Sequence, residues 1–423
     1  MNAIFDFFQY IVNLGVSVMM PLIITVLGLI FGNKFSASFK SGLTVGVGFV
    51  GLNVIAALMT TAISPVTKAL VENYNFHLVA TDIGWGVGSS LAWGTQIVPF
   101  VFITVIATNV VMILLNWTKT MDVDIWNFWH SMMIAGALYL TTKSMILALL
   151  SAVINMAIVF KIADWTQNDL DEVLGLEGIS FPQIQSSGWA LIGCPLNWLF
   201  DRIPGVKNIS WTPEKVQSKL GIFGEPMLIG LFVGGILAAA ARMPLDQILQ
   251  TAVTIAASLV LMPRMVALLM DGLTLISESA QEWMQKRFEG RELYIGLDSA
   301  LGIGHPYVLT TGLLMIPVAL ILAFILPGNK VLPLADLTAL PYFMIFAIVP
   351  SKGNLFRGLI TGVIFTAIIL YCATYAAPIV TQLAAQVGYQ LPADTEMVTS
   401  LAVGSQWYTW IIYALFKAIG GIF

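Results

Sequence analysis

Two side chains that can exchange hydrogen bonds with a ligand stand in an otherwise apolar, glycine-rich segment, LYIGLDSALGIGHPYVLTTGLL (293–314). Asp298 supplies a carboxylate, which can accept hydrogen bonds from two hydroxyl groups. His305 supplies an imidazole, which both donates and accepts when neutral. Long apolar runs follow this segment, and an ionisable group at membrane depth is costly enough to be a functional hypothesis by default. These residue types suit a site for a neutral, hydroxyl-bearing ligand.

Further candidate ligand contacts are polar or aromatic residues in or beside segments rich in glycine or proline. They are Asp82, Trp85, Trp93, Gln96, His130, Gln183, Gln185 and Glu225. Each has a structural alternative. Asp298 could bind a backbone amide or Arg264, and the histidines could be hydrogen-bonded packing residues. The tryptophans could anchor at a membrane interface, and Glu225 could simply favour the dipole of the helix that it precedes. The sequence leaves both interpretations open.

The composition is typical of an integral membrane protein. Of the 423 residues, 58% are hydrophobic and 10% charged, whereas a soluble domain is about 25% charged; the mean hydropathy is +0.87. The net charge of −4 argues against a nucleic-acid partner. Cys194 and Cys372 show no metal-binding or CxxC spacing and have no cationic neighbours in sequence. We therefore expect no metal, no cofactor and no catalytic thiol.

The second half of the chain repeats the first weakly. Five short blocks recur in the same order, among them DIGWGVGSS (82–90) and YIGLDSALGIGH (294–305). This pattern predicts a duplication, as in many transporters. Apolar runs predict an all-α polytopic membrane protein with about eleven transmembrane helices, five in each repeat and one more. The predicted crossings are 10–31, 40–62, 98–117, 125–141, 143–161, 221–241, 247–270, 313–327, 337–350, 355–388 and 401–421. Because five is odd, the second repeat should be inverted.

Two segments, 77–97 and 293–311, follow the second crossing of each half, and neither resembles a lipid-facing helix. Irregular backbone at membrane depth survives only when it is buried in protein or lines a cavity. We therefore expect two re-entrant hairpins, an outer and an inner one, whose tips meet near the membrane midplane. The distribution of Lys and Arg predicts an outside N-terminus and a cytoplasmic C-terminus.

Six segments follow from these expectations. They are a scaffold part (1–76), a core part with the outer hairpin (77–161), a cytoplasmic amphipathic connector (162–220), a second scaffold part (221–292), a second core part with the inner hairpin (293–390) and a last crossing (391–423). Because both hairpins belong to the core, we expect an elevator in which the core slides against the scaffold.

Seven short motifs together resemble the galactitol family of IIC components, the membrane subunits of the sugar-transporting phosphotransferase system. They are VDIWNFWH (123–130), GLEGISFP (175–182), GIFGEP (221–226), LMPRM (261–265), MDGLT (270–274), IGLDSALGIGH (295–305) and GNLFR (353–357). The resemblance spans nearly the whole chain. The sequence departs from the family at Gln183, where some members have His, and at Ser299, where Pro is common.

The resemblance, which extends to the related ascorbate IIC proteins, implies a multi-pass homodimer in the bacterial inner (cell) membrane. Each protomer would join a core domain to a V-shaped dimerisation domain. The chain would bind and translocate a polyol or sugar, and a separate IIB protein, supplied by IIA, would phosphorylate it. The partners would thus be substrate, IIB and membrane lipid, and the chain itself would not be an enzyme.

Two other functions stay open. An ion-coupled secondary transporter would share the inverted repeats and broken helices. An intramembrane enzyme would use Asp298 and His305 as acid and base, but the sequence holds no nucleophile motif or phosphate-binding glycine loop to support it.

Overall fold

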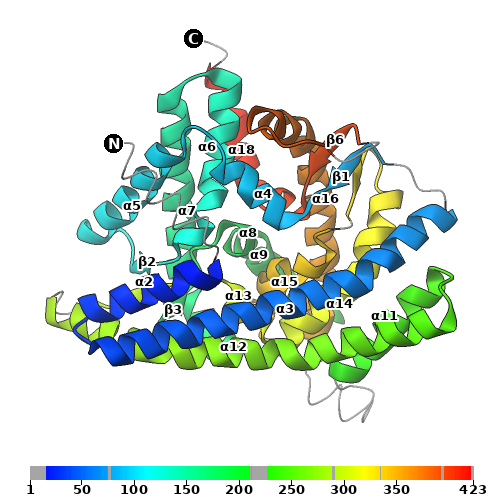
Figure 1. The fold of residues 1–423 in the computed structure, drawn as a ribbon, viewed down its shortest axis with the longest axis horizontal. Helices are drawn as coiled ribbons and strands as arrows, with labels where there is room; N and C mark the ends of the chain where they lie inside the picture. The colour runs from blue at the N-terminus through cyan, green and yellow to red at the C-terminus, as the bar shows by residue number, and fades with distance from the viewer. Residues whose placement is uncertain are drawn as a thin grey trace.

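The computed structural model describes residues 16–74, 78–209, 211, 226–287, 291–333, 335–391 and 395–420. These residues are mostly helical and form two layers. In Figure 1 two long helices, each preceded by a shorter one, run along the base of the molecule, and the other helices lie above them. We call these the scaffold layer and the core layer.

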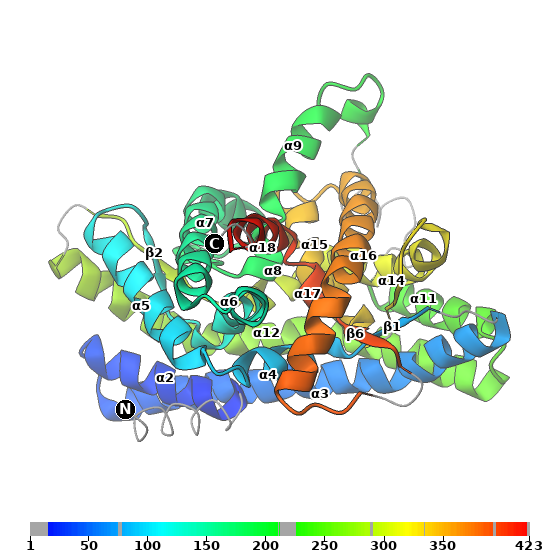
Figure 2. The ribbon, with the colours of Figure 1, turned by 90° about the horizontal axis from the view of Figure 1, so that it is seen from above.

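The scaffold layer consists of two helical hairpins. Helix α2 (Val16–Ile30) leads into α3 (Phe35–Tyr74), and α11 (Pro226–Ala240) leads into α12 (Leu245–Arg287). Figures 1 and 2 show α3 and α12 side by side. With 40 and 43 residues, each is roughly 60 Å long. The crossings expected at 40–62 and 247–270 are therefore parts of longer helices.

Small residues bring α3 and α12 together. A Cβ atom on Gly272 would lie 2.9 Å from Val45 N. The Ser41 hydroxyl donates to the Gly272 carbonyl oxygen across the same contact. Between apolar helices in lipid no hydrophobic force drives association, so close backbone approach and hydrogen bonds supply the attraction.

The core layer holds helices from both halves of the chain. The first half gives α4 (Gly84–Trp93), α5 (Val98–Leu114), η1 (Ile125–Phe128), α6 (Trp129–Thr142), α7 (Met145–Leu174), α8 (Ile184–Ser187), α9 (Ala190–Phe200) and η2 (Val206–Asn208). The second half gives α13 (Ala300–Ile303), α14 (Pro306–Ile325), η4 (Leu337–Ala339), α15 (Leu340–Ile348), α16 (Leu355–Gln386), α17 (Leu401–Gly404) and α18 (Trp407–Gly420).

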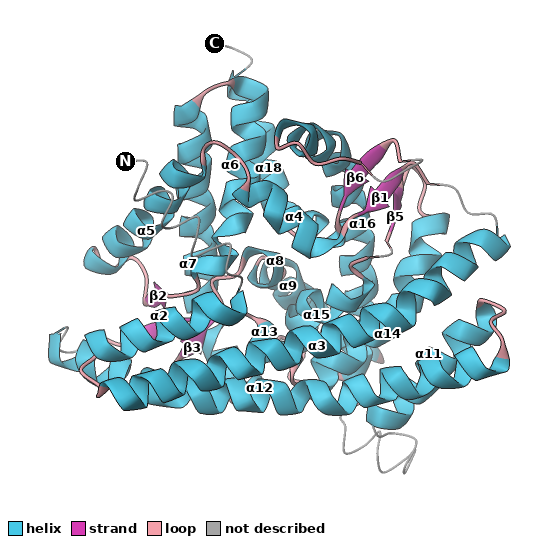
Figure 3. Cartoon of the chain, viewed as in Figure 1, coloured by secondary structure: helices cyan, strands magenta, loops and turns pink. Residues whose placement is uncertain are grey.

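The expectation of an all-α chain is wrong in one respect, because the described residues include six short strands that form two parallel sheets. One sheet has the order β5–β1–β6, from Val331–Leu332, Ala80–Asp82 and Met397–Thr399; the other has the order β2–β4–β3, from Thr120–Asp122, Tyr294–Gly296 and Ile179–Ser180. Figure 3 shows them as two separate magenta groups. Buried non-helical backbone must still pair its N–H and C=O groups, and these strands do so.

The strands are exchanged between the halves. Strand β1, from the first half, lies between two strands of the second half, with Ala80 opposite Val331 and Met397. Strand β4, from the second half, lies between two strands of the first half, with Ile295 opposite Met121 and Ile179. Each sheet therefore joins both halves of the core layer.

Several helices of the described ranges can cross a bilayer by length and composition. These are α7, α14 and α16, together with α4 and α5, which form a fourth apolar segment bent by 97°. The expected break between 77–97 and 98–117 falls at this bend. Helix α14 begins at Pro306, earlier than the crossing expected at 313, so the inner irregular segment is confined to β4, α13 and their flanking residues. The molecule is thus a helical protein with apolar segments suited to a membrane.

The link from α12 to β4 is tied to the core layer. Arg291 Nη1 donates to the Ile113 carbonyl oxygen (3.0 Å), and Lys119 Nζ lies 2.7 Å from Glu292 Oε2. This hydrogen bond raises the pKa of Lys119 and lowers the pKa of Glu292. Both side chains are largely exposed, so the pair contributes little stability, but it marks residues 291–292 as part of the core layer.

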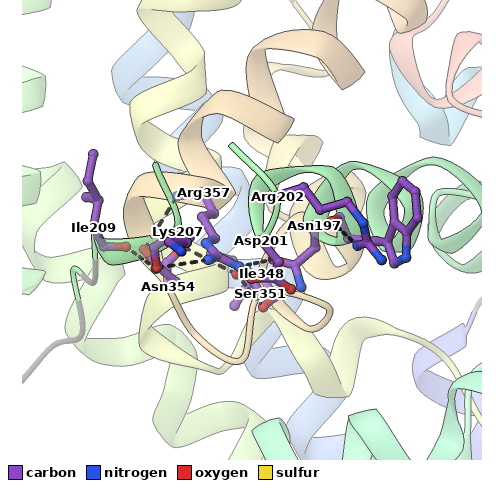
Figure 4. A network of polar contacts seen from close by, with 10 residues as sticks. Asn197, Asp201, Arg202, Lys207, Ile209, Ile348, Ser351, Asn354 and Arg357 are labelled. Atoms are coloured by element: carbon purple, nitrogen blue, oxygen red, sulfur yellow. Dashed lines mark hydrogen bonds and ion pairs between the residues drawn. The ribbon is translucent and has the colours of Figure 1, made fainter. Parts of the chain in front are cut away.

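The connector expected at 162–220 divides into two parts in the structure. The first part of this connector, up to Leu174, is the last part of α7, and after β3 and α8 the chain projects from the core as α9 (Figure 2). A polar network then fastens this projection to the start of α16 (Figure 4). Arg357 Nη1 lies 2.7 Å from Asp201 Oδ1 and 2.8 Å from Asn197 Oδ1, and Asn354 Nδ2 donates to the Ile209 carbonyl oxygen (2.8 Å).

Candidate functional site

The carboxyl ends of the two sheets gather polar residues of the core layer. All strands of a parallel sheet point the same way, so the residues that follow them meet at one edge. The β2–β4–β3 sheet is followed by Asp124, Asp298 and Gln183, and the β5–β1–β6 sheet ends in or is followed by Asp82, Asp336 and Ser400. The molecule therefore has two comparable polar edges.

Gln183 organises the first edge. Its Nε2 donates to Asn127 Oδ1 (3.1 Å), and its Oε1 accepts from Ser299 N (3.2 Å) and from Ser186 Oγ (3.1 Å). The Ser186 and Ser299 hydroxyl oxygens lie 2.7 Å apart. Both ends of one buried amide thus connect the segments after β2, β3 and β4.

Two carboxylates complete this edge. Asp298 Oδ1 accepts from Ala300 N (2.8 Å), and the side chains of Asn127 and Gln183 lie close to the same carboxylate. Asn127 Nδ2 also donates to Asp124 Oδ2. Asp124 is buried, whereas Asp298 is half-buried. We call Asp124, Asn127, Gln183 and Asp298 the strand-end cluster.

The strand-end cluster has no charge-neutralising partner in the part of the chain that the structure describes, where no ion pair includes Asp124 or Asp298. Arg264, a possible partner of Asp298 from sequence, is exposed on α12. Nor do the described residues contain a group of three or more His, Cys, Asp or Glu that could hold a metal ion. Carboxylates accept hydrogen bonds and amides both accept and donate, so the cluster suits a small neutral molecule with several hydroxyl groups.

His130 adjoins the strand-end cluster from the first turn of α6. Its Nδ1 lies 2.6 Å from the Asn127 carbonyl oxygen. A carbonyl oxygen can only accept, so Nδ1 carries a proton; in the neutral imidazole Nε2 is then an acceptor. The side chain of Gln185 lies close to the same ring. The structure therefore brings together Asp298, Gln183, Gln185 and His130.

The second edge is occupied by backbone amides. Asp82 accepts from Gly84 N at Oδ1 (3.0 Å) and from Asp336 N at Oδ2 (2.8 Å). Asp336 accepts from Trp85 N at Oδ1 (2.6 Å) and from Ala402 N at Oδ2 (2.9 Å). All four carboxylate oxygens thus fix the local backbone, and Asp82 belongs to this edge rather than to the strand-end cluster.

The other sequence candidates lie apart from the strand-end cluster's hydrogen bonds. His305 precedes α14, is half-buried and packs edge-on against Tyr307 with ring centroids 5.0 Å apart. Trp85 is half-buried at the start of α4, and Trp93, at its end, is buried against Phe102. Gln96 is exposed. Glu225 lies outside the described residues.

Sequence inspection did not propose four participants as ligand contacts, namely Asp124, Asn127, Ser186 and Ser299. One signal was present, because Asp124, Asn127 and His130 follow one another at intervals of three residues, the spacing of one helix face. Ser299 follows Asp298 directly. Ser186 carries no sequence signal, since its role depends on how the segment after β3 meets that after β4.

The chain matches a known protein family over most of its length. Residues 10–394 match the family described as "PTS system sugar-specific permease component". The chain is 39% identical to a "Putative permease IIC component" of Escherichia coli (strain K12) over 412 residues, which cover 96% of this chain and 93% of that protein. It is also 38% identical to the "PTS system galactitol-specific EIIC component" of the same strain over 409 residues, covering 97% and 90%.

These matches agree with the motifs of the sequence and with the apolar helices of the core layer. The resemblance to the galactitol IIC proteins is thereby confirmed over nearly the whole chain. The chain belongs to the family of sugar-specific permease components (EIIC) of the phosphotransferase system, which are membrane proteins.

Proposed function

We propose that this chain binds a polyol or sugar at the strand-end cluster and carries it across the bacterial inner membrane, and that a separate IIB protein phosphorylates it. The observation that carries this proposal is the cluster itself, in which one carboxylate and two amides lie around half-buried Asp298 and neither acid forms an ion pair among the described residues. The similarity to a protein named as galactitol-specific supports a polyol as the substrate class.

We further propose that the two halves are inverted repeats. Each half runs through the same series of elements, from a helical hairpin through a strand, a short helix and a longer one, to a second strand. Each then adds a 3₁₀ turn, two helices, a third strand, a short helix and a last helix. The exchange of β1 and β4 between the sheets supports a two-fold relation between the halves. Eleven crossings would follow if further helices cross the bilayer as the sequence predicts.

The scaffold layer would form the V-shaped dimerisation domain, and the core layer would move against it as an elevator. Small cavities lie where the described parts of the two layers meet. One is lined by Val66 and Leu320 among others, and another by Leu27, Met121 and Leu297 among others; apolar side chains line nearly all of both. Apolar contact is non-directional, so such a boundary can shift without breaking a fixed set of hydrogen bonds.

The orientation proposed is an outside N-terminus and a cytoplasmic C-terminus, because most Lys and Arg residues then lie on the cytoplasmic side. The exposed residues Lys207, after α9, and Gln247, in the first turn of α12, would lie on opposite sides. A membrane-impermeant thiol reagent added to intact cells should label Gln247→Cys and spare Lys207→Cys, in a chain without Cys194 and Cys372. The reverse pattern would overturn the orientation.

The proposed function is tested in vesicles reconstituted with the purified chain. Vesicles loaded with IIB, IIA and their phosphoryl donor should accumulate polyol phosphate, and vesicles without these carriers should accumulate nothing. Accumulation of unmodified polyol under an ion gradient alone would show a secondary transporter instead. Conversion of polyol by the chain without carriers would show an enzyme.

A further inference from the structure

Among the buried side-chain atoms of the core layer that complete no hydrogen bond within the described part of the chain, four come from neighbouring helices. These atoms are His130 Nε2, Asn155 Oδ1, Gln185 Oε1 and Tyr408 OH. The exposed fractions of the four residues are 0%, 0%, 8% and 5%. Nearly every buried polar group in a protein is paired with protein, water or ligand. Four unpaired groups therefore indicate a place that a polar molecule fills.

The four side chains come from α6, α7, α8 and α18, and the packing brings them to one level. A Cβ atom on Gly420 would lie 2.8 Å from Thr142 Cγ2, and Trp407 Nε1 donates to the Gly188 carbonyl oxygen (3.3 Å). Helices α18 and α6 thus run in the same direction. Tyr408 lies twelve residues before Gly420, as His130 does before Thr142, and equal helical rise puts both at the same height.

Contacts made by neighbouring residues link the segments that carry these four side chains. A Cβ atom on Gly188, which follows α8, would lie 2.7 Å from the Tyr408 ring, and Gln185 in α8 lies close to the His130 ring. On α7, Asn155 Nδ2 donates to Ser131 Oγ (3.2 Å), beside His130. We call His130, Asn155, Gln185 and Tyr408 the acceptor cluster.

The chemistry of the acceptor cluster selects its ligand. A neutral imidazole nitrogen and two amide oxygens can only accept, and the tyrosine hydroxyl can accept or donate. The filling molecule must therefore bring hydrogen-bond donors. Hydroxyl groups do so, whereas a phosphate dianion brings only acceptors and would face repulsion. Among the described residues, no Lys or Arg side chain donates a hydrogen bond to any of these four atoms.

Asn127 joins the two clusters. Its side-chain oxygen accepts from Gln183 in the strand-end cluster, and its carbonyl oxygen accepts from His130 in the acceptor cluster. We propose that the acceptor cluster is the second half of the substrate site and that it binds the hydroxyl groups at the far end of a long polyol. This inference rests on the proposed function, since it places the near end of the polyol at the strand-end cluster. Tyr408, Gln185 and Asn155 thereby become residues that select substrate length.

The test compares a six-carbon with a four-carbon polyol by calorimetric titration of the full-length protein in detergent. Tyr408→Phe removes the hydroxyl and keeps the ring against Gly188, and Gln185→Met removes the amide with little change of volume. The matched control is Tyr413→Phe. The Tyr413 hydroxyl is also unpaired within the described residues, but its ring lies against Tyr375 of α16, with 6.4 Å between the ring centroids. Asp298→Asn reports on the strand-end cluster.

We expect Tyr408→Phe and Gln185→Met each to weaken binding of the six-carbon polyol about tenfold, the loss of one hydrogen bond, and to leave the four-carbon polyol unaffected. Tyr413→Phe should change neither. Unchanged six-carbon binding in both acceptor-cluster variants would show that only water fills the cluster, and equal weakening for both lengths would exclude length selection. If Asp298→Asn changes nothing, the proposed site at the strand ends fails. A wild-type protein that binds neither polyol would contradict both proposals.

Discussion

At the scale of single residues, two aspartates near the carboxyl ends of central strands have different environments. Asp82 ends β1 and Asp298 follows β4, the central strands of the two sheets. Both oxygens of Asp82 accept from backbone amides. Among the described residues only Oδ1 of Asp298 accepts from the backbone. Asp298 therefore keeps acceptor capacity for a ligand, whereas Asp82 uses its capacity to hold the chain.

Asp298→Asn should weaken polyol binding by about 1.5–3 kcal/mol, because it removes a charge-assisted hydrogen bond to a substrate hydroxyl. Calorimetric titration of the purified variant measures the change. Its fold should persist, because the Asn oxygen can still accept from Ala300 N.

The control for this variant is Asp82→Asn. It should lower the thermal unfolding temperature and leave polyol affinity near the wild-type value, because its oxygens bind the backbone amides of Gly84 and Asp336. Normal affinity in a well-folded Asp298→Asn protein would remove Asp298 from the site.

At the scale of elements, the sequence predicted helices far better than strands. Long apolar runs marked α7, α14 and α16, although α3 and α12 extend well past their expected ends because polar turns continue the same helices. The six strands have only two or three residues each, too few for the alternation that identifies a strand. Candidate site residues were recognisable by type, as with Asp298, Gln183 and His130. Their contact depends on the exchange of strands between halves, which no local pattern encodes.

Arg357 links the end of α9 to the start of α16. Arg357 is 8% exposed and binds Asp201 and Asn197 through Nη1 (Figure 4). Arg357→Ala should destabilise the protein by about 2–3 kcal/mol, because charge-assisted hydrogen bonds of a buried group are lost. Thermal unfolding in detergent, followed by tryptophan fluorescence, measures this change.

Arg202→Ala is the matched control for that substitution. Arg202 is exposed and stacks on Trp198, 3.4 Å from the ring centroid, a contact that contributes about 0.5–1 kcal/mol at an exposed position. A loss as large as that of Arg357→Ala would show that the projection is held by its surface contacts rather than by the buried guanidinium.

At the scale of the whole molecule, the two sheets join the halves of the core layer, since each contains strands of both. The core layer is thereby expected to move as one body and to carry both clusters with it. The scaffold layer holds its own helices by internal contacts, such as Ser41 with Gly272 and Asn33 Nδ2 with Ser279 Oγ (2.7 Å). Hydrogen bonds thus act within each layer, and the boundary between the layers relies on non-directional apolar contact.

An elevator requires that boundary to slide, so a bond across it should stop transport. Leu27 of α2 and Met121 of β2 line one cavity between the layers. In a chain whose Cys194 and Cys372 are replaced, cross-linking Leu27→Cys to Met121→Cys should abolish transport and spare polyol binding. The control pair lies within the scaffold layer, where Gly51 of α3 contacts Met265 of α12. Cross-linking Gly51→Cys to Met265→Cys should leave transport intact. If the protein with cross-linked layers still transports at the normal rate, the substrate crosses without sliding of the core. The elevator would then be replaced by a site at fixed depth that opens alternately to each side of the membrane.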